Sequence, residues 1–186
     1  MTCIKKINKE KITMKKGINN FWMMLIGLAI IASACSKEKN YTSADEWVDD
    51  VKMGLKSITV EELKQKVDDF EMIYVLDVRE PMEHYHGLIP GSINLPGGLV
   101  VFNMEVDGFW EAEMTYPPQK SDEIIVYCKK GKRSVLAADA LKRLGYENIS
   151  YLDGGWKKWE ITYPLEYEEK LDMLGGHEET EDVGGC

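Results

Sequence analysis

Short apolar runs alternate with helix-forming segments through the middle of this 186-residue chain. The runs are rich in β-branched and aromatic residues and are too short for helices, which is typical of buried strands. They lie at residues 72–78, 93–94, 124–127 and 149–152. A helix is predicted to start at Thr59, because Thr59 and Glu62 have the spacing of a capping box, and to run to about Val67. Strands that alternate with helices predict an α/β fold, with a central parallel sheet flanked by helices on both faces.

The turn after the third run carries the residues that indicate chemistry. Residues 128–134 have the sequence CKKGKRS, and a helix is predicted to follow over residues 134–144. Ligands of parallel sheets gather at the carboxyl ends of the strands, which is where Cys128 lies. Inward backbone N–H groups, the positive end of the helix and four nearby cations would favour negative charge on the sulfur. Gly131 lets the backbone turn where a side chain would obstruct it. A buried structural cysteine is the alternative, and the four cations make it the less favoured one.

This loop resembles the active loop of the single-domain rhodaneses, a family of sulfurtransferases. The family pattern is cysteine, two residues, glycine, one residue, arginine, then serine or threonine, and residues 128–134 match every fixed position. Two further blocks also resemble the family and follow in its order. The upstream block consists of VLDVREP at residues 75–81, Glu83, Gly87 and IPGSINLP at 89–96, and the downstream block consists of LKRLGY at 141–146, YLDGGW at 151–156 and Trp159. Three motifs in order are far more specific than one. The resemblance covers about residues 56–162 and implies a rhodanese-like three-layer domain.

The resemblance also implies an activity and a set of site residues. Sulfane sulfur would pass from a donor such as thiosulfate to a thiol or cyanide acceptor through a persulfide on the catalytic Cys128. The loop amides would hold the terminal sulfur, Arg133 would bind an oxyanion or brace the loop, and the lysines would attract anionic donors. The active-loop residues are therefore Lys129, Lys130, Gly131, Lys132, Arg133 and Ser134. Asp77 and Arg79 would support the loop, although an ordinary ion pair at a strand end is an equally good interpretation. No cofactor is expected.

Two other functions remain open. Phosphatases and arsenate reductases of the same architecture place five residues between cysteine and arginine, whereas this chain has the four residues 129–132. The shorter loop between cysteine and arginine encloses less space, which suits a single sulfur atom better than a tetrahedral oxyanion. The phosphatase or arsenate reductase alternative therefore ranks low. A noncatalytic rhodanese module that binds a protein partner is the second alternative, although such modules commonly lack the cysteine.

The three histidines do not predict a metal site. His84 and His86 are two residues apart, and His177 lies in the acidic C-terminal segment. Neither a cysteine nor a third histidine completes a ligand set with the usual spacing. We therefore expect ordinary surface residues, with the ring of His84 partly packed, and no bound metal.

Residues 1–34 predict a signal peptide. Six lysines and one acid precede an uncharged run at residues 21–34, which is shorter than the roughly 20 residues of a membrane-spanning helix. The run ends in Ala-Ser-Ala before Cys35, which resembles the lipobox of bacterial lipoproteins, whose cysteine is lipidated. An uncleaved anchor with an incidental cysteine is the alternative, and either Met1 or Met14 could be the start.

We thus expect four regions and an envelope location. The regions are a lipoprotein-type signal peptide at 1–34, a tether and lead-in segment at 35–55, the rhodanese-like domain at 56–165 and an acidic flexible tail at 166–186. Loss of residues 1–34 changes the net charge from −9 to −14 and leaves an acidic body, which argues against nucleic-acid binding. The domain would be anchored by lipid at Cys35 to a bacterial membrane and would face the periplasm or the exterior. Its partners would be a small anionic sulfur donor and a thiol or cyanide acceptor, with a redox protein as one candidate.

Overall fold

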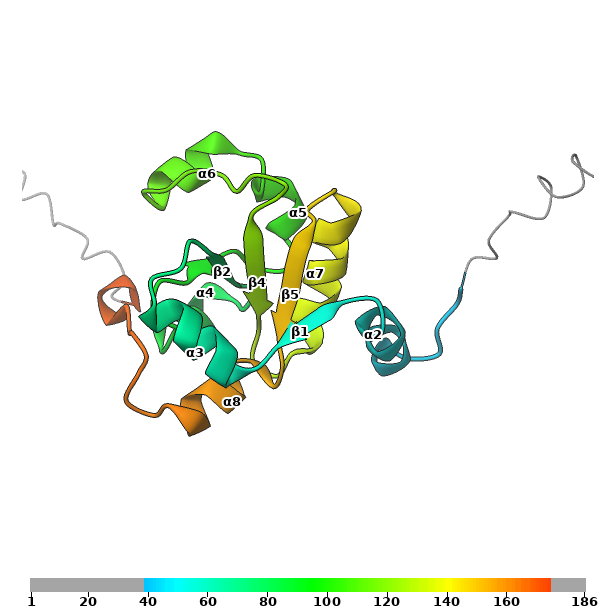
Figure 1. Ribbon diagram of the computed structural model, residues 1–186, viewed down its shortest axis with the longest axis horizontal. Helices are drawn as coiled ribbons and strands as arrows, with labels where there is room; N and C mark the ends of the chain where they lie inside the picture. Colours follow the sequence, from blue (N-terminus) through cyan, green and yellow to red (C-terminus); the bar gives the residue numbers. More distant parts are fainter. Residues whose placement is uncertain (1–38, 175–186) are drawn as a thin grey trace, which may run out of the picture. The chain divides into compact units, whose positions relative to one another are not determined.

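A parallel sheet forms the centre of the fold (Figure 1). The computed structural model describes residues 39–174, and within them five parallel strands have the order β1-β5-β4-β2-β3. The strands are β1 (Lys56–Ile58), β2 (Tyr74–Asp77), β3 (Ile93–Asn94), β4 (Glu123–Tyr127) and β5 (Asn148–Leu152). The predicted parallel sheet and its four predicted strands are therefore confirmed. The short edge strand β1 was not predicted, and Ile58 is its one buried residue.

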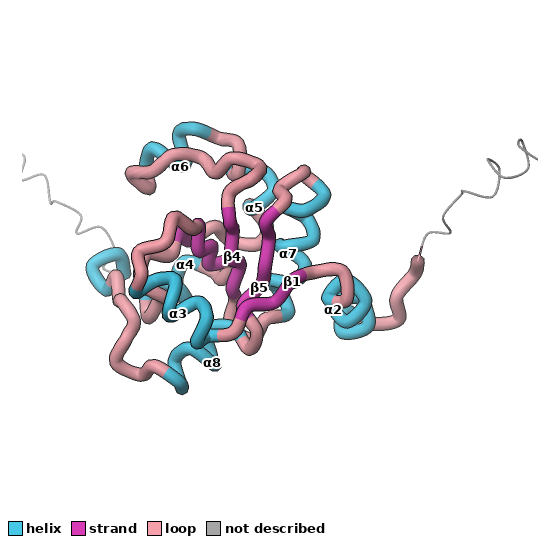
Figure 2. The backbone as a smooth tube through the Cα atoms, in the orientation of Figure 1, coloured by secondary structure: helices cyan, strands magenta, loops and turns pink. Residues whose placement is uncertain are grey.

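Helices cover both faces of this sheet (Figure 2). They are α2 (Ala44–Lys52), α3 (Val60–Asp68), α4 (Pro81–Tyr85), α5 (Val100–Asn103), α6 (Asp107–Ala112), α7 (Lys132–Arg143) and α8 (Gly155–Thr162), with a 3-10 turn η1 at Leu171–Leu174. On one face, Val75 and Ile125 pack with residues of α3 and α8. On the other face, Leu76 and Val126 pack with residues of α5, α6 and α7. Successive residues of a strand point to opposite faces, so β2 and β4 are buried on both sides and the predicted three-layer arrangement is confirmed.

The N-terminal cap of α3 has the predicted geometry. The hydroxyl of Thr59 accepts a hydrogen bond from the amide of Glu62 at 3.1 Å, and the Glu62 carboxylate accepts one from the amide of Thr59 at 2.8 Å. The two residues thus satisfy each other's backbone donors, which is the capping box that their spacing predicted.

Helix α2 lies inside the segment that was predicted to be a tether and lead-in. Ser43 caps it, and Val48 on its inner face packs against Val135 of α7 and Tyr151 of β5. At its first turn, the carboxylate of Asp45 lies 2.6 Å from the Nζ atom of Lys132. This part of the predicted lead-in therefore belongs to the packed domain and reaches the Cys128 loop at Lys132.

The chain beyond α8 also contacts the domain. Leu88 and Glu168 form an antiparallel bridge, and the indole N–H of Trp159 donates to the carbonyl oxygen of Glu166 at 2.8 Å. The first residues of the predicted tail are thus attached to the domain. The predicted signal peptide, Cys35 and residues 175–186 lie outside the described residues. Between residues 39 and 174, no helix is long and apolar enough to cross a membrane.

Candidate active site

Cys128 follows β4 at the carboxyl end of the sheet, as predicted. Its side chain is a free thiol, and the residue is 1% exposed. The Sγ atom accepts a hydrogen bond from the amide of Gly131 at 3.2 Å. Gly131 has a φ of +95° and precedes the first residue of α7, so the chain turns back over the sulfur at this glycine. Among the described amides, that of Gly131 is the one with a hydrogen bond to this sulfur, so the predicted convergence of several amides is not seen in this state.

Amides at the N-terminal end of α8 donate hydrogen bonds to the loop. The amide of Trp156 donates to the carbonyl oxygen of Cys128 at 2.8 Å, and the amide of Lys157 donates to that of Lys129 at 3.0 Å. These bonds require close approach of two backbones at Gly155. A Cβ atom built on Gly155 would lie 2.2 Å from the Cys128 carbonyl oxygen. The glycine pair in the YLDGGW block therefore has a steric reason.

Ser134 braces the loop from its other end. Its buried hydroxyl donates to the carbonyl oxygen of Gly131 at 2.9 Å. This bond holds the turn at the start of α7 and leaves the hydroxyl directed at the backbone. Ser134 therefore lies at the loop, as predicted, and its hydroxyl stabilises the turn.

Arg133 forms a two-bond ion pair with Glu83 of α4. Its Nη1 and Nη2 atoms lie 2.8 Å and 3.0 Å from the two carboxylate oxygens. The hydrogen bond with Glu83 is the main cause of a raised Arg133 pKa, and interaction with Cys128 adds to it. The same pair lowers the pKa of Glu83. The upstream family-like block contains Glu83, but no role was predicted for it, because the contact joins residues 50 positions apart.

Three cavities border the loop. One of about 200 Å³ is lined by residues 130–132 and by residues of α2. Of the other two, the larger has a volume of about 540 Å³ and the smaller about 300 Å³. The larger is lined by Arg79, Met82, Glu83, His86, Lys129, Lys130, Trp156, Lys157 and Glu160. The smaller is lined by Arg133 with residues of the β2 and β3 ends, α5 and α7, among them Glu80 and Gly97. The predicted residues Lys129 and Lys130 thus face the larger cavity together with Arg79, while the ammonium of Lys132 is paired with Asp45.

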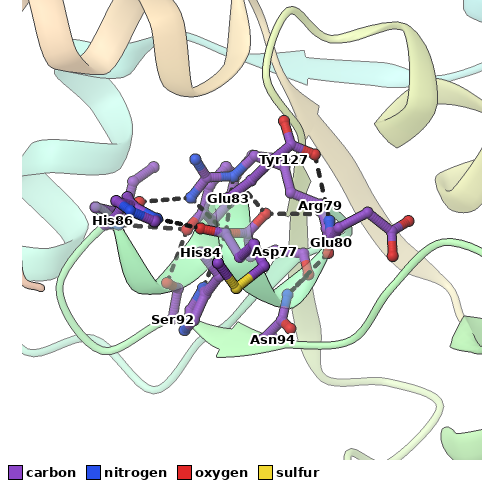
Figure 3. Close-up of polar contacts among 12 residues, drawn as sticks. Asp77, Arg79, Glu80, Glu83, His84, His86, Ser92, Asn94 and Tyr127 are labelled. Carbon is purple, nitrogen blue, oxygen red and sulfur yellow. Dashed lines mark hydrogen bonds and ion pairs between the residues drawn. The ribbon is translucent and has the colours of Figure 1, made fainter. Parts of the chain in front are cut away.

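Asp77 and Arg79 form a buried ion pair beside this site (Figure 3). The Arg79 Nη2 atom donates to Asp77 Oδ2 and to the carbonyl oxygen of Gly87, both at 2.6 Å. The guanidinium also stacks over the ring of Trp156 at 4.8 Å. Burial acts to raise the pKa of Asp77, but hydrogen bonds from His84 and Arg79 outweigh it and hold that pKa below its ordinary value. Asp77 and Arg79 were interpreted either as an ordinary ion pair at a strand end or as support for the loop. The structure shows the ion pair, and the pair also places Arg79 in the wall of the larger cavity.

His84 belongs to the same cluster. We expected a surface residue with a partly packed ring; the ring is packed, but the surface position is wrong. The residue is 1% exposed, and its Nδ1 atom lies 2.9 Å from Asp77 Oδ2 (Figure 3). An ionised carboxylate accepts but cannot donate, so Nδ1 carries the proton in this contact. The Nε2 atom is buried without a partner among the described residues. Sequence spacing could not show that Asp77 supplies a partner for this ring inside the fold.

The family comparison agrees with this geometry. Residues 59–162 match the family model of the rhodanese-like domain. The chain belongs to the rhodanese-like family. The buried Cys128 loop and Gly155, which packs against it, lie within the matched residues.

Relatives of this rhodanese-like chain carry sulfurtransferase names. A putative mitochondrial thiosulfate sulfurtransferase of Schizosaccharomyces pombe is 37% identical over 107 residues, which cover 49% of this chain and 75% of the relative. A thiosulfate:glutathione sulfurtransferase of Saccharomyces cerevisiae is 33% identical, with 56% and 78% covered. The solved human single-domain sulfurtransferase TSTD1 has a TM-score of 0.53 at 25% identity, with 57% and 96% covered. These similarities support sulfurtransferase function in general.

The described part of this rhodanese-like domain does not contain an evident metal site. Between residues 39 and 174, no group of three or more His, Cys, Asp or Glu side chains is placed to hold a metal ion. His86 is exposed, and its Nδ1 atom contacts the carbonyl oxygen of Met82 at 2.6 Å. The two described histidines therefore lie in different environments, one buried against a carboxylate and one at the surface.

Proposed function

We propose that this protein is a thiosulfate-type sulfurtransferase that carries sulfur as a persulfide on Cys128. The observation that carries the proposal is the hydrogen bond from the Gly131 amide to the Cys128 sulfur at the start of α7. An amide directed at a sulfur stabilises negative charge there, and the cation Arg133 interacts with the same thiol. A family of relatives named as sulfurtransferases supports the same chemistry.

The reaction proceeds in two displacements. In the first, the Cys128 thiolate attacks the outer sulfur of thiosulfate, the sulfur–sulfur bond of the donor breaks, and sulfite leaves with the bonding electron pair. Cys128 then holds the outer sulfur as a persulfide anion. In the second, an acceptor thiolate or cyanide attacks that outer sulfur and the Cys128 thiolate leaves. The enzyme returns to its first state without net oxidation or reduction.

The larger cavity suits an anionic donor. Its wall contains the cations Arg79, Lys129, Lys130 and Lys157. Arginine and lysine side chains attract sulfonate-like groups, arginine with a directional pair of N–H donors and lysine as a point charge. Asp77 keeps the Arg79 guanidinium in this wall through its buried ion pair, so Asp77 acts by positioning and does not react.

A noncatalytic binding module remains the second candidate, because the thiol is buried in this state. The phosphatase alternative has less support, since the loop between Cys128 and Arg133 is one residue short of that pattern. The lipid at Cys35 and the envelope location stay predictions of the sequence.

Intact mass after incubation with thiosulfate tests the proposal. We expect the wild-type protein to gain one sulfur atom, the Cys128→Ser variant to gain none, and cyanide to remove the added mass. Cys186→Ser is the matched control, because it removes a cysteine outside the described residues and should leave the gain intact. Absence of the gain in the wild type, or its persistence in Cys128→Ser, would contradict the persulfide on Cys128 and favour the binding module.

A further inference from the structure

The ion pair between Glu83 and Arg133 lies at the Cys128 loop. Its two residues line different cavities. Glu83 lines the larger cavity and Arg133 lines the smaller one. Both N–H groups of the guanidinium fork are engaged, at 2.8 Å and 3.0 Å. The side chains of Arg133 and Glu83 are 43% and 29% exposed, so solutes can reach the pair, whereas Cys128 is 1% exposed.

Glu83 occupies two of the five N–H donors of Arg133, one on each Nη atom. A carboxylate and a sulfonate bind such a pair of donors in the same way, with two parallel N–H···O bonds. A thiosulfate dianion that approaches Arg133 therefore meets one pair of donors that is already filled and a negative charge beside it. A neutral reagent needs no contact with Arg133 and does not meet this competition.

We propose that Glu83 is a specificity-determining residue, an internal anion that an anionic sulfur donor must displace from Arg133 to reach Cys128. The inference rests on the proposed function for the identity of the donor. In this role Glu83 disfavours anionic reagents at the Cys128 thiol. The affinity for charged donors then depends on Glu83 as well as on the cations of the loop. The partial exposure of Glu83 allows its carboxylate to be hydrated when it is displaced.

A purely structural role for Glu83 predicts a different outcome. Its carboxylate also accepts a hydrogen bond from the amide of Glu80 at 3.3 Å, at the start of α4. Glu83→Gln keeps the shape and an acceptor oxygen for that amide while it removes the charge. If the pair served only to hold α4 to the loop, the variant would change the reactivity of Cys128 toward charged and neutral reagents by the same factor.

The test compares alkylation of Cys128 by iodoacetate and iodoacetamide, which share a reactive carbon and differ in charge. Rates at Cys128 are followed by peptide mass in the wild type, in Glu83→Gln and in Asp139→Asn. Asp139 is the matched control, because its carboxylate also pairs with an arginine, Arg143, at 2.7 Å, and it does not line the larger or the smaller cavity. We expect the ratio of iodoacetate to iodoacetamide rates to rise about three- to tenfold in Glu83→Gln and less than about twofold in Asp139→Asn.

Steady-state kinetics with thiosulfate give the second readout. Glu83→Gln should lower KM for thiosulfate with little change in kcat, since it removes competition for binding. An unchanged alkylation ratio, or an equal rise in Asp139→Asn, overturns the role of Glu83 even where the persulfide forms. A changed ratio without any persulfide overturns the proposed sulfur transfer and leaves the competition at Arg133 standing.

Discussion

Gly155 permits the close contact between α8 and the catalytic loop. It has a φ of +61°, and a Cβ atom at this position would overlap the carbonyl oxygen of Cys128. We expect Gly155→Ala to destabilise the fold by about 1 to 3 kcal/mol through overpacking, with a further cost for a left-handed alanine. Sulfur transfer should fall as well, because the displaced loop would move Cys128. Urea unfolding and intact mass after thiosulfate measure the two effects.

Gly145→Ala separates the steric effect from the backbone effect. Gly145 has a φ of +90°, but a Cβ atom there would meet nothing within 4 Å. This control carries the left-handed penalty without the overlap, so it should lose less stability and retain sulfur transfer. Equal losses in the two variants would show that contact with the loop is not what requires Gly155.

At the scale of the element, two helices are followed by a residue that is not glycine and has a left-handed backbone conformation. Helices α3 and α6 are each followed by a large apolar residue in a left-handed conformation, Phe70 with a φ of 53° and Met114 with a φ of 55°. In both, the next amide donates back to the last helical turn, as in Glu71 N to Lys66 O at 3.0 Å. This is the Schellman pattern, in which glycine is the usual left-handed residue.

Phe70→Gly should therefore stabilise the protein. The phenylalanine is 90% exposed and contributes little burial, while a left-handed non-glycine residue costs about 1 to 2 kcal/mol. The backbone entropy of glycine offsets part of the gain, so we expect a net increase of about 0.5 to 1 kcal/mol in the free energy of unfolding. Phe70→Ala keeps the Cβ atom and should bring no such increase. Thermal and urea unfolding compare the three proteins. A free energy of unfolding for Phe70→Gly that is no higher than that for Phe70→Ala would contradict this explanation.

Helix α2 shows what an element-level pattern can miss. Its nine residues include four acids, and Val48 is the one buried residue. Two packed apolar positions, Val48 and Val51, are too few to establish a helical period, and residues 35–55 were predicted to be a tether and lead-in segment. The helix instead depends on partners that are distant in the chain, Val135 and Tyr151, which complete a small apolar cluster with Val48.

At the scale of the whole molecule, the Asp77 cluster links parts of the fold that meet around the active site. Asp77 ends β2, His84 lies on α4, and Arg79 contacts both the Gly87 carbonyl and Trp156 of α8. Since the pKa of Asp77 is below its ordinary value of 3.8, its ionised form stabilises the folded state at higher pH. This contribution is lost as pH falls below about 4, through the lower folded-state pKa.

Asp77→Asn should expose that contribution. At pH 7 the variant leaves Arg79 buried without its counter-ion, and we expect a loss of about 3 to 5 kcal/mol in the free energy of unfolding. The difference from the wild type should narrow at about pH 3, below the ordinary aspartate pKa, because the unfolded wild-type chain takes up a proton at Asp77 there. Urea unfolding at both pH values measures it. A difference that stays constant or grows toward low pH would show that the charge of Asp77 is not what the fold uses.

The local sequence determined several elements and the loop of this protein. Apolar runs placed four of the strands, the Thr59 and Glu62 spacing placed the start of α3, and the loop motif marked Cys128. These features depend on neighbours a few residues away, on strand-forming side chains, backbone caps and turn glycines. A pattern of that kind can be recognised without knowledge of the rest of the chain.

Tertiary structure alone decided which side chains meet. It paired Arg133 with Glu83, placed His84 against Asp77 inside the fold and packed α2 on α7. The carboxylate and the guanidinium fork of the first pair are far apart in the sequence, and the buried place of His84 depends on a partner at the end of β2. Such contacts arise because parallel strands bring their carboxyl ends to one edge of the sheet, where loops from separate parts of the chain converge.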